Sequence, residues 1–445
     1  NASFPSWTSP VRARSPALAE VAENQTDTMK APGTGCLSRV GDRANIHAKH
    51  WGKLQLTSEL HSAHSSPLLT DAKTDNKVGP AYSVPSIMNF EAFVFRHIRF
   101  AAVLFLLSRP VIAQTVQYDG SRAGLIERLK GSVVSEDGGL ATPTRLIVVG
   151  EQLVVLDRGA DKVIRVYDVG SGRLHAAFGR HGQGPGEFSG AWELLPGIAP
   201  RSVWVLDVSL RRVTALNLDS LVLPRGYRGD AMVTLSGEGS LENLQLLSGR
   251  GVIGTGTFAR GRLAHYSSTG GFLRTVGTPP RGDRRWSSVV AQDAFSARLG
   301  VHQVTNRVVV AYRWTDRLEV LDPEGTLLTT MERPLGFEPV VSSKSDFRAA
   351  FTLDSRHAYL STASSGRHVY SLFSGRTERE AGKAMSFGRD VLVFSFDGKI
   401  RRILRLDADV IAMAVDESEA EIFALAHDPH PRILRFKIPK LPDTP

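Results

Sequence analysis

The chain has 445 residues, of which 42% are hydrophobic and 22% are charged, so it is long enough and apolar enough to fold around a core. Its 41 glycines and 23 prolines suit a turn-rich β protein and are too few for a low-complexity chain. The net charge of +9 is mild and spread out, which argues against a nucleic-acid partner, and the single cysteine, Cys36, excludes a disulfide framework or a thiolate metal site.

Residues 1–87 differ from the rest of the chain. Ser, Thr, Ala, Pro and His are common there, and no apolar periodicity persists. We interpret this stretch as sequence upstream of a natural start at Met88, outside the fold. A genuine disordered N-terminal region is the alternative.

Residues 88–113 have the pattern of a secretory signal peptide. A basic segment precedes the apolar run Phe100–Leu107, and Val111-Ile112-Ala113 fits the rule for a cleavage site. We therefore expect a mature chain that starts near Gln114, is periplasmic or secreted, and is not an integral membrane protein. The alternative is an uncleaved anchor, although the apolar run is shorter than the about 20 residues that span a bilayer.

Residues 114–445 contain a strand–turn–strand unit that recurs. Val154–Leu156 ends in Asp157, and Val203–Leu206 ends in Asp207; in both places a second apolar run begins six residues after the Asp. Short runs rich in β-branched and aromatic residues, bounded by Gly, Asp, Pro and Ser, continue to the C-terminus. A repeat of about fifty residues indicates a propeller or a solenoid.

About six such units are expected, near residues 140–190, 191–229, 230–280, 290–335, 355–405 and 406–440. The sequence therefore predicts an all-β fold, a six-bladed β-propeller of four-stranded antiparallel blades, over residues 114–445. We further expect the first mature strand, near Thr115–Tyr118, to pair into the last blade and close the ring.

Two stretches carry a resemblance to known families. Gly179–Phe188, with the sequence GRHGQGPGEF, looks like the inter-blade signature of NHL-type propellers. The C-terminal runs, from His368–Arg376 through Val391–Lys399 to Ile433–Phe436, resemble the TolB-like six-bladed propellers in order, spacing and turn residues. The resemblance implies an exported propeller, a class that is usually of unassigned function, and it transfers no catalytic residues.

Asp157, Asp207 and Asp416 each end an apolar strand. Propeller turns can face the central channel, where carboxylates bind cations such as Ca²⁺. Asp at a strand end more often bonds to its own backbone in an Asx-turn, and we favour that interpretation.

Other motifs also have an ordinary structural explanation that we favour. The glycine-rich Gly179–Phe188 lacks the Gly-Lys-Ser/Thr of a phosphate loop and suits a loop between blades. His427–Pro431 holds two histidines in a rigid turn without a visible third metal ligand. Arg281–Trp286 is the most basic cluster and is expected to be a solvated loop rather than a site for an acidic partner or nucleic acid.

Six aromatic residues are candidates for a carbohydrate or peptide cleft: Trp192, Trp204, Trp286, Trp314, Tyr312 and Tyr370. Aromatic side chains in strands more often form the core between blades, which is the interpretation that we favour. No Gly-x-Ser-x-Gly elbow is present, although a triad assembled from distant residues would leave no motif.

These observations predict an exported monomeric binding module that takes a peptide, protein or glycan ligand at one face. No catalytic, cofactor or metal residue is assigned. The alternative is a metal-dependent propeller hydrolase or lyase with acidic residues in the central channel. Three or more Asp, Glu, His or Asn side chains that converge on the axis at metal-ligand distance would favour the enzyme, because fold alone does not decide function.

Overall fold

The unit that repeats in the sequence is a four-stranded antiparallel sheet, or blade. In the first blade, β3 (Pro143–Val149), β4 (Gln152–Asp157), β5 (Ile164–Asp168) and β6 (Leu174–Phe178) pair in chain order. Every residue of β4 is buried, whereas β6 is mostly exposed. Near the axis a blade is covered on both faces, so its strands there are continuous apolar runs.

The computed structural model describes residues 116–440 except 136–138, 198, 223–228, 238, 250, 281, 284 and 343–347. The described residues belong to one structural unit. The expected upstream segment, residues 1–87, and the expected signal peptide, residues 88–113, lie outside them.

Three more blades have the same strand order as the first. Their strands are β9 (Ala191–Pro196), β10 (Ser202–Asp207), β11 (Arg212–Asn217) and β12 (Ala231–Thr234) in the second; β13 (Ser240–Leu247), β14 (Gly251–Thr257), β15 (Leu263–Tyr266) and β16 (Phe272–Val276) in the third; and β17 (Ala297–His302), β18 (Arg307–Tyr312), β19 (Leu318–Leu321) and β20 (Leu327–Thr330) in the fourth.

The fifth and sixth blades share one long strand, β26 (Ile400–Val415), and so form a single eight-stranded sheet. The first half of β26 pairs with β25, and its second half pairs with β27. The other strands of this sheet are β23 (Tyr359–Ser364), β24 (His368–Phe373), β25 (Gly388–Ser395), β27 (Glu421–Ala426), β28 (Arg432–Lys437), β2 (Ser132–Ser135) and β1 (Ile126–Leu129). Four separate blades and two in the joined sheet make the six that the sequence predicts.

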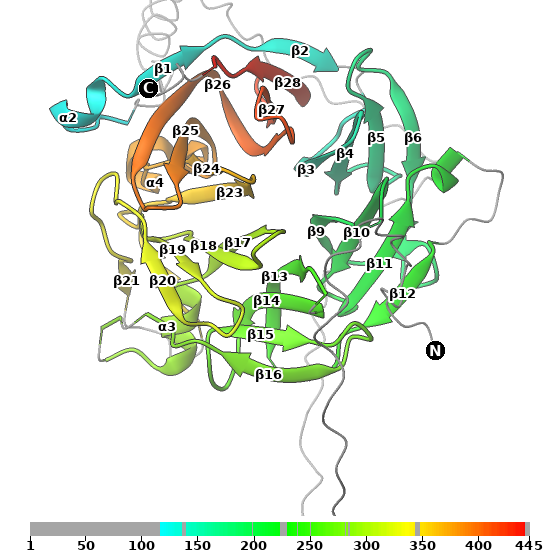
Figure 1. Ribbon diagram of the computed structural model, residues 1–445, viewed down its shortest axis with the longest axis horizontal. Helices are drawn as coiled ribbons and strands as arrows, with labels where there is room; N and C mark the ends of the chain where they lie inside the picture. The colour runs from blue at the N-terminus through cyan, green and yellow to red at the C-terminus, as the bar shows by residue number, and fades with distance from the viewer. Residues whose placement is uncertain are drawn as a thin grey trace, which may run out of the picture. The chain divides into compact units, whose positions relative to one another are not determined.

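The inner strands of the six blades close a ring. Each of β3, β9, β13, β17, β23 and the second half of β26 contacts the next, and β26 contacts β3. Figure 1 shows these strands facing the centre of the propeller, and the view from behind shows the same order.

The N-terminal part of the described chain completes the last blade, although not with the expected residues. β2 pairs antiparallel with β28 as the outer strand of the sixth blade, and β1 pairs parallel with β26 at Ile403–Leu406. Thr115 lies outside the described residues. Tyr118 instead packs against the fifth blade, where its hydroxyl donates a 2.8 Å hydrogen bond to Asp390.

The hydrophobic core of the described residues is divided among the spaces between blades. Leu156 and Val203 belong to a cluster between the first and second blades, and five more clusters follow around the ring. The sixth cluster joins Leu153 of the first blade to Phe423 of the last. Burial of apolar surface therefore holds the ring closed as well as each blade to its neighbour.

Few other elements occur among the described residues, and they are short. The two short strand pairs are β7 (Arg180–His181) with β8 (Glu187–Phe188), which is parallel, and β21 (Val341–Ser342) with β22 (Ala350–Phe351), which is antiparallel. The helices are α2 (Gly120–Ala123), α3 (Ser288–Ala294), α4 (Glu378–Ala381), η1 (Ser220–Val222) and η2 (Gly382–Ser386).

The glycine-rich segment Gly179–Phe188 connects β6, the outer strand of the first blade, to β9, the inner strand of the second, as the sequence predicts. Gly179 has φ of +74°, and a Cβ there would lie 2.5 Å from the ring of Phe188. Glu187 accepts a hydrogen bond of 2.9 Å from the backbone N–H of Gly184, and its carboxylate also pairs with Arg180. The loop is thus held by its own side chains. The backbone N–H of Gly184 donates to the Glu187 carboxylate and not to an external anion.

Candidate functional site

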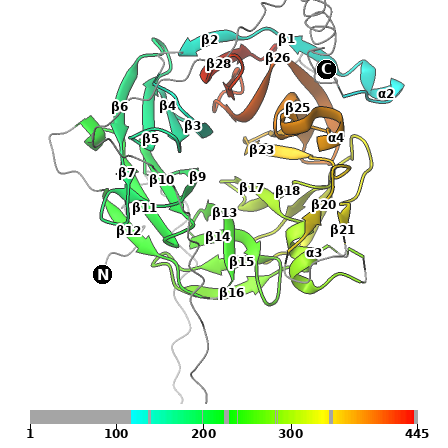
Figure 2. The same cartoon turned by 180° about the vertical axis from the view of Figure 1, so that it is seen from behind.

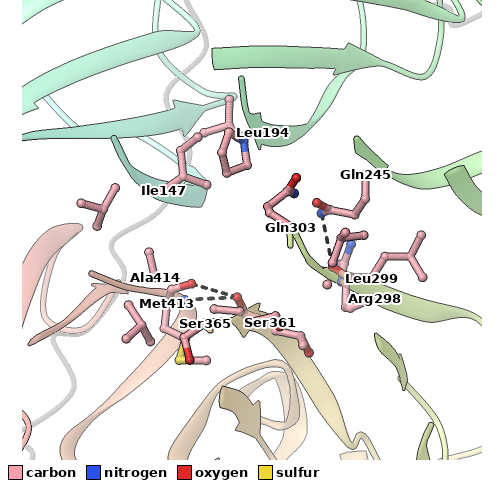
Figure 3. A pocket seen from close by; sticks show the side chains of 18 of the residues that line it. Ile147, Leu194, Gln245, Arg298, Leu299, Gln303, Ser361, Ser365, Met413 and Ala414 are labelled. Carbon is pink, nitrogen blue, oxygen red and sulfur yellow. Dashed lines mark hydrogen bonds between the residues drawn. The ribbon is translucent and has the colours of Figure 1, made fainter. Parts of the chain in front are cut away.

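The axis of the propeller holds a cavity of about 580 Å³. All six inner strands and the turns that follow them contribute lining residues. Figure 3 shows Ile147 and Leu194 on one side, with Ser361 and Ala414 opposite them. Ring closure alone creates this cavity, because its walls come from strands that are far apart in the sequence.

Exposure changes along the cavity. At one end, the turns after the inner strands contribute Ser248, Gln303 and Val304, which are exposed, Val304 to 88%. At the other end, Asn243 and Met413 are buried. The cavity therefore has a mouth on the side of these turns and an inner end that the protein encloses.

The walls combine apolar and hydrogen-bonding groups. Gln245 Nε2 donates to the carbonyl of Leu299 at 3.3 Å, and Ser361 Oγ donates to the carbonyl of Met413 at 3.1 Å. The Ser364 hydroxyl is buried without a hydrogen-bond partner. Five of the inner strands, namely β3, β9, β13, β17 and β23, are also edges of their sheets, and an edge strand presents backbone N–H and C=O groups that no neighbouring strand pairs with.

A cluster of charged side chains lies at the inner end. Glu193 Oε2 accepts hydrogen bonds from Arg145 Nε at 3.2 Å and from Asn243 Nδ2 at 2.5 Å, and it lies 3.5 Å from Arg298 Nη1. Asn243 Oδ1 in turn accepts from the backbone N–H of Leu299 at 3.1 Å. Two guanidinium groups therefore share a single carboxylate.

Further charged groups stand near this cluster. Burial lowers the pKa of Arg298 well below its ordinary value, and the positive charges of Arg145 and Arg313 lower it further. Burial also lowers the pKa of Arg313 and raises the pKa of Glu242, and the positive charge of Arg313 opposes the rise at Glu242. The inner end is thus a region where several charges are taken out of water together.

His357 lies just before β23 of the fifth blade, near enough to Arg313 and Arg298 for their charges to act on it. Its ring packs 4.3 Å from that of Trp314, which stacks at 3.8 Å on Phe351. Nδ1 lies 3.2 Å from the carbonyl of Met385, and burial lowers the pKa of His357 to about 3. The imidazole is therefore neutral, with Nδ1 as the donor and Nε2 as an acceptor that is buried without a partner among the described residues.

Asp157 and Asp207 are fully buried and bind backbone, but not chiefly their own turn. Asp157 accepts from the N–H groups of Ala141 and Thr142 at 2.8 and 2.7 Å, just before the inner strand β3. Asp207 holds the segment before β9 in the same way, accepting from Ser189 and Gly190. Each Asp therefore fixes the segment that enters its blade, a longer-range role than the expected Asx-turn.

Asp416 differs from these two. It sits at the mouth of the channel and accepts from the backbone N–H groups of Ala420 at 2.8 Å and Glu421 at 2.6 Å, within its own turn, as the sequence suggests. Among the residues that the structure describes, no three His, Cys, Asp or Glu side chains form a group that could hold a metal ion.

His427–Pro431 forms the turn between β27 and β28. His427 Nε2 lies 2.8 Å from the carbonyl of Pro143, where the sixth blade meets the first, and His430 is exposed. The basic segment Arg281–Trp286 is described only in part. Arg285 and Asp283 form an exposed ion pair there, and Trp286 packs against the core between the third and fourth blades.

The aromatic candidates separate into two groups. Trp204, Trp314, Tyr312 and Tyr370 are buried, as the core interpretation predicts. Trp192 and Trp286 are half-buried, and Arg158 lies over the ring of Trp192 at 4.9 Å. None of the six is among the residues that line the cavity.

One polar cluster at the mouth involves a serine and a histidine. Glu419 accepts from Ser365 Oγ, from His368 Nδ1 at 2.9 Å and from Tyr370 at 3.1 Å. These hydrogen bonds lower the pKa of Glu419, although burial acts in the opposite direction. The serine donates to the carboxylate and not to the histidine, which is not the order of a nucleophilic triad.

The charged residues at the inner end were not among the sequence candidates. Arg145, Glu193, Asn243 and Arg298 come from four different blades and share no motif. One sequence feature could have identified them, namely a charged or amide residue within the first apolar run of a repeat. Glu193 in Ala191–Pro196 is an example. Such a residue on a buried strand needs partners from other strands.

The ring of six blades and the cavity on its axis define a six-bladed β-propeller with a central ligand-sized channel. A family model described as TolB-like 6-blade propeller-like matches residues 128–418. The chain belongs to this family. No curated protein matches the sequence.

Solved structures are similar to this chain at low sequence identity. One, described as U3-55K, has 12% identity and a TM-score of 0.43, over 72% of this chain and 100% of that chain. Another, from Bacteroides fragilis NCTC 9343 and described as exported, has 10% identity and a TM-score of 0.48, over 74% of this chain and 99% of that chain. In the described part of this protein, no helix has the length and apolar character to cross a bilayer.

Proposed function

We propose that this chain is an exported binding module that holds an extended peptide segment in its central channel. The observation that carries the proposal is the cavity of about 580 Å³ to which all six inner strands contribute. Pockets for small ligands have volumes of about 300–1,000 Å³. The cavity suits a few residues of a chain and is too small for a folded domain.

The chemistry of the walls supports a peptide ligand. Ile147 and Leu194 offer apolar contact, while Gln245 and Gln303 offer hydrogen bonds. Edge strands supply further backbone donors and acceptors, the groups that recognise extended peptides elsewhere. A glycan is less favoured, because the aromatic residues that were candidates for stacking on sugars lie in the core or away from the cavity.

The proposal includes export, which the signal-peptide pattern of residues 88–113 supports. We expect protein recovered from the envelope fraction of its host to begin near Gln114 when its N-terminus is sequenced. Recovery of a peptide from within residues 1–87 in the native protein would contradict the proposed start and processing.

Peptide binding is tested with the full chain immobilised and offered a synthetic pool of random hexapeptides. Gln245 is directed into the cavity (Figure 3), so Gln245→Trp is expected to narrow the channel and strongly reduce retention. His175→Trp, on the exposed outer strand β6, is the matched control and is expected to retain peptides as the unmodified chain does. Retained peptides are identified by mass spectrometry, and thermal unfolding verifies that both variants fold.

Two outcomes would overturn this function. The first is a pool from which the unmodified chain enriches no peptide. The second is enrichment that Gln245→Trp leaves unchanged, because binding would then take place outside the channel.

A further inference from the structure

The inner end of the channel has more positive than negative charge facing the cavity. Arg145 and Arg298 both line it, and the carboxylate that lies between them is that of Glu193. Arg145 also donates to the carbonyl of Thr144 at 2.7 Å, which satisfies one of its N–H groups but neutralises no charge. One carboxylate for two guanidinium groups leaves a surplus of one positive charge.

The hydrogen-bonding capacity of Arg298 is not used up. The side chain is 12% exposed, its closest charged partner is 3.5 Å away, and its Nε is buried without a hydrogen-bond partner in the described part of the chain. A buried guanidinium donor without an acceptor is destabilising, and more so because the group is charged. Arg298 therefore has both charge and donors available for an anion.

Neighbouring groups compensate for this only in part. The Arg313 guanidinium makes no hydrogen bond or ion pair with the described residues and lies 5.8 Å from the ring of Trp314. His357 is neutral, so it adds no charge of either sign. Two further carboxylates, Glu242 and Asp293, act electrostatically on Arg313, and burial raises the pKa of Glu242. The mutual repulsion of Arg145, Arg298 and Arg313 would be relieved by a further anion.

We propose that the inner end of the channel binds a carboxylate of the ligand, held chiefly by Arg298 with Arg145 beside it. The planar guanidinium fork matches a carboxylate in a bidentate arrangement. This inference rests on the proposed function, because it assigns the chemistry of the group that reaches the enclosed end of the channel. The carboxylate comes either from the C-terminus of the peptide or from an Asp or Glu side chain.

Three synthetic hexapeptide pools, all N-acetylated, separate these sources. The first lacks Asp and Glu and has a free C-terminal carboxylate. The second lacks Asp and Glu and ends in an amide. The third ends in an amide and contains one Asp or Glu. Each is offered to the immobilised full chain, and retention is measured by mass spectrometry.

The first or the third pool is expected to be retained at least tenfold better than the second, because a charge-assisted hydrogen bond contributes about 1.5–3 kcal/mol. Preference for the first identifies a C-terminal carboxylate, and preference for the third identifies a side chain. Arg298→Met is expected to remove the preference, and Arg298→Lys, which keeps the charge without the fork, to reduce it. Arg285→Met is the control, because Arg285 is 81% exposed in a surface ion pair.

Equal retention of all three pools, strongly reduced in Gln245→Trp, would overturn the carboxylate inference and leave the channel as the binding site. Retention of no pool would instead overturn the proposed function itself. Preserved preference in Arg298→Met, with that variant folded by its thermal unfolding curve, would also contradict the role assigned to Arg298.

Discussion

The aspartates at the ends of strands show how one residue type acquires two roles in the same repeat. Asp207 is fully buried and accepts backbone hydrogen bonds from Ser189 at 2.7 Å, from Gly190 at 3.0 Å and from Leu210 at 3.0 Å. Asp416 makes similar bonds within an exposed turn. The difference in burial decides how much each carboxylate contributes to stability, because water replaces lost hydrogen bonds only at the exposed site.

Asp207→Ala is expected to lower the free energy of unfolding by about 3 kcal/mol, because it leaves buried backbone donors without an acceptor. Asp416→Ala, the matched control, is expected to change it by less than about 1 kcal/mol. Urea denaturation measures both. A cation role for Asp207 would appear as a shift of the unmodified chain's midpoint on adding EDTA; we expect none. Equal effects of the two substitutions would contradict the structural assignment.

His357 is expected to make stability depend on pH. Its pKa falls on folding from about 6.5 to about 3, because the ring is buried and faces Arg313 and Arg298. The neutral ring contributes full stability above the unfolded pKa, and this contribution is lost as pH falls from about 6.5 towards 3. The loss is on the order of 1.4 kcal/mol for each pH unit, because the unfolded chain binds the proton and the folded chain does not.

The measurement compares the free energy of unfolding at several pH values for the unmodified chain and for His357→Gln. The variant is expected to have a shallower slope between pH 6.5 and pH 4. His175→Gln removes an exposed histidine and is expected to keep the slope of the unmodified chain. An unchanged slope in His357→Gln would show that other groups dominate acid unfolding.

At the scale of elements, the sequence predicts inner and middle strands better than outer ones. β4 and β10 are buried at every residue, so they appear as unbroken apolar runs ending in Asp157 and Asp207. The closing strand β2 has the sequence SVVS and is largely exposed, and it pairs with β28, about 300 residues further along the chain. So short and exposed a strand gives no strong pattern, which is why closure was expected at Thr115–Tyr118.

Ring closure by β2 predicts a specific loss of stability. A chain that starts at Gly139 lacks β1 and β2, so β28 becomes an exposed edge and the sixth blade has three strands. We expect this chain to unfold at lower urea concentration and to aggregate more readily, since unpaired edges template association. A chain that starts at Gln114 keeps both strands and is the control. Equal midpoints by circular dichroism would mean that β2 does not hold the ring closed.

At the scale of the whole molecule, the fold was predictable and the channel chemistry was not. Six repeats of strand and turn define a propeller because each blade has the same local requirements. The cluster at the inner end obeys no such repeat: Arg145, Glu193, Asn243 and Arg298 each occur once, in four blades. Whether these four residues meet depends on which strand face points to the axis and on how the ring closes. Both depend on contacts between residues that are far apart in the sequence, so no local sequence pattern reveals them.

The closed ring also predicts how the whole molecule unfolds. Every described blade interface contains a buried apolar cluster, and the last cluster joins the sixth blade to the first. Loss of one blade exposes two such interfaces, so the blades are expected to unfold together rather than in sequence.

Trp204 in the second blade and Trp314 beside the fourth report on separate interfaces. Variants that keep only one of these tryptophans, with Phe at the other tryptophan positions, are expected to give coincident urea transitions by fluorescence. The two variants must first have the same unfolding transition by circular dichroism. If their fluorescence midpoints then differ, the two interfaces unfold independently and ring closure does not make them cooperative.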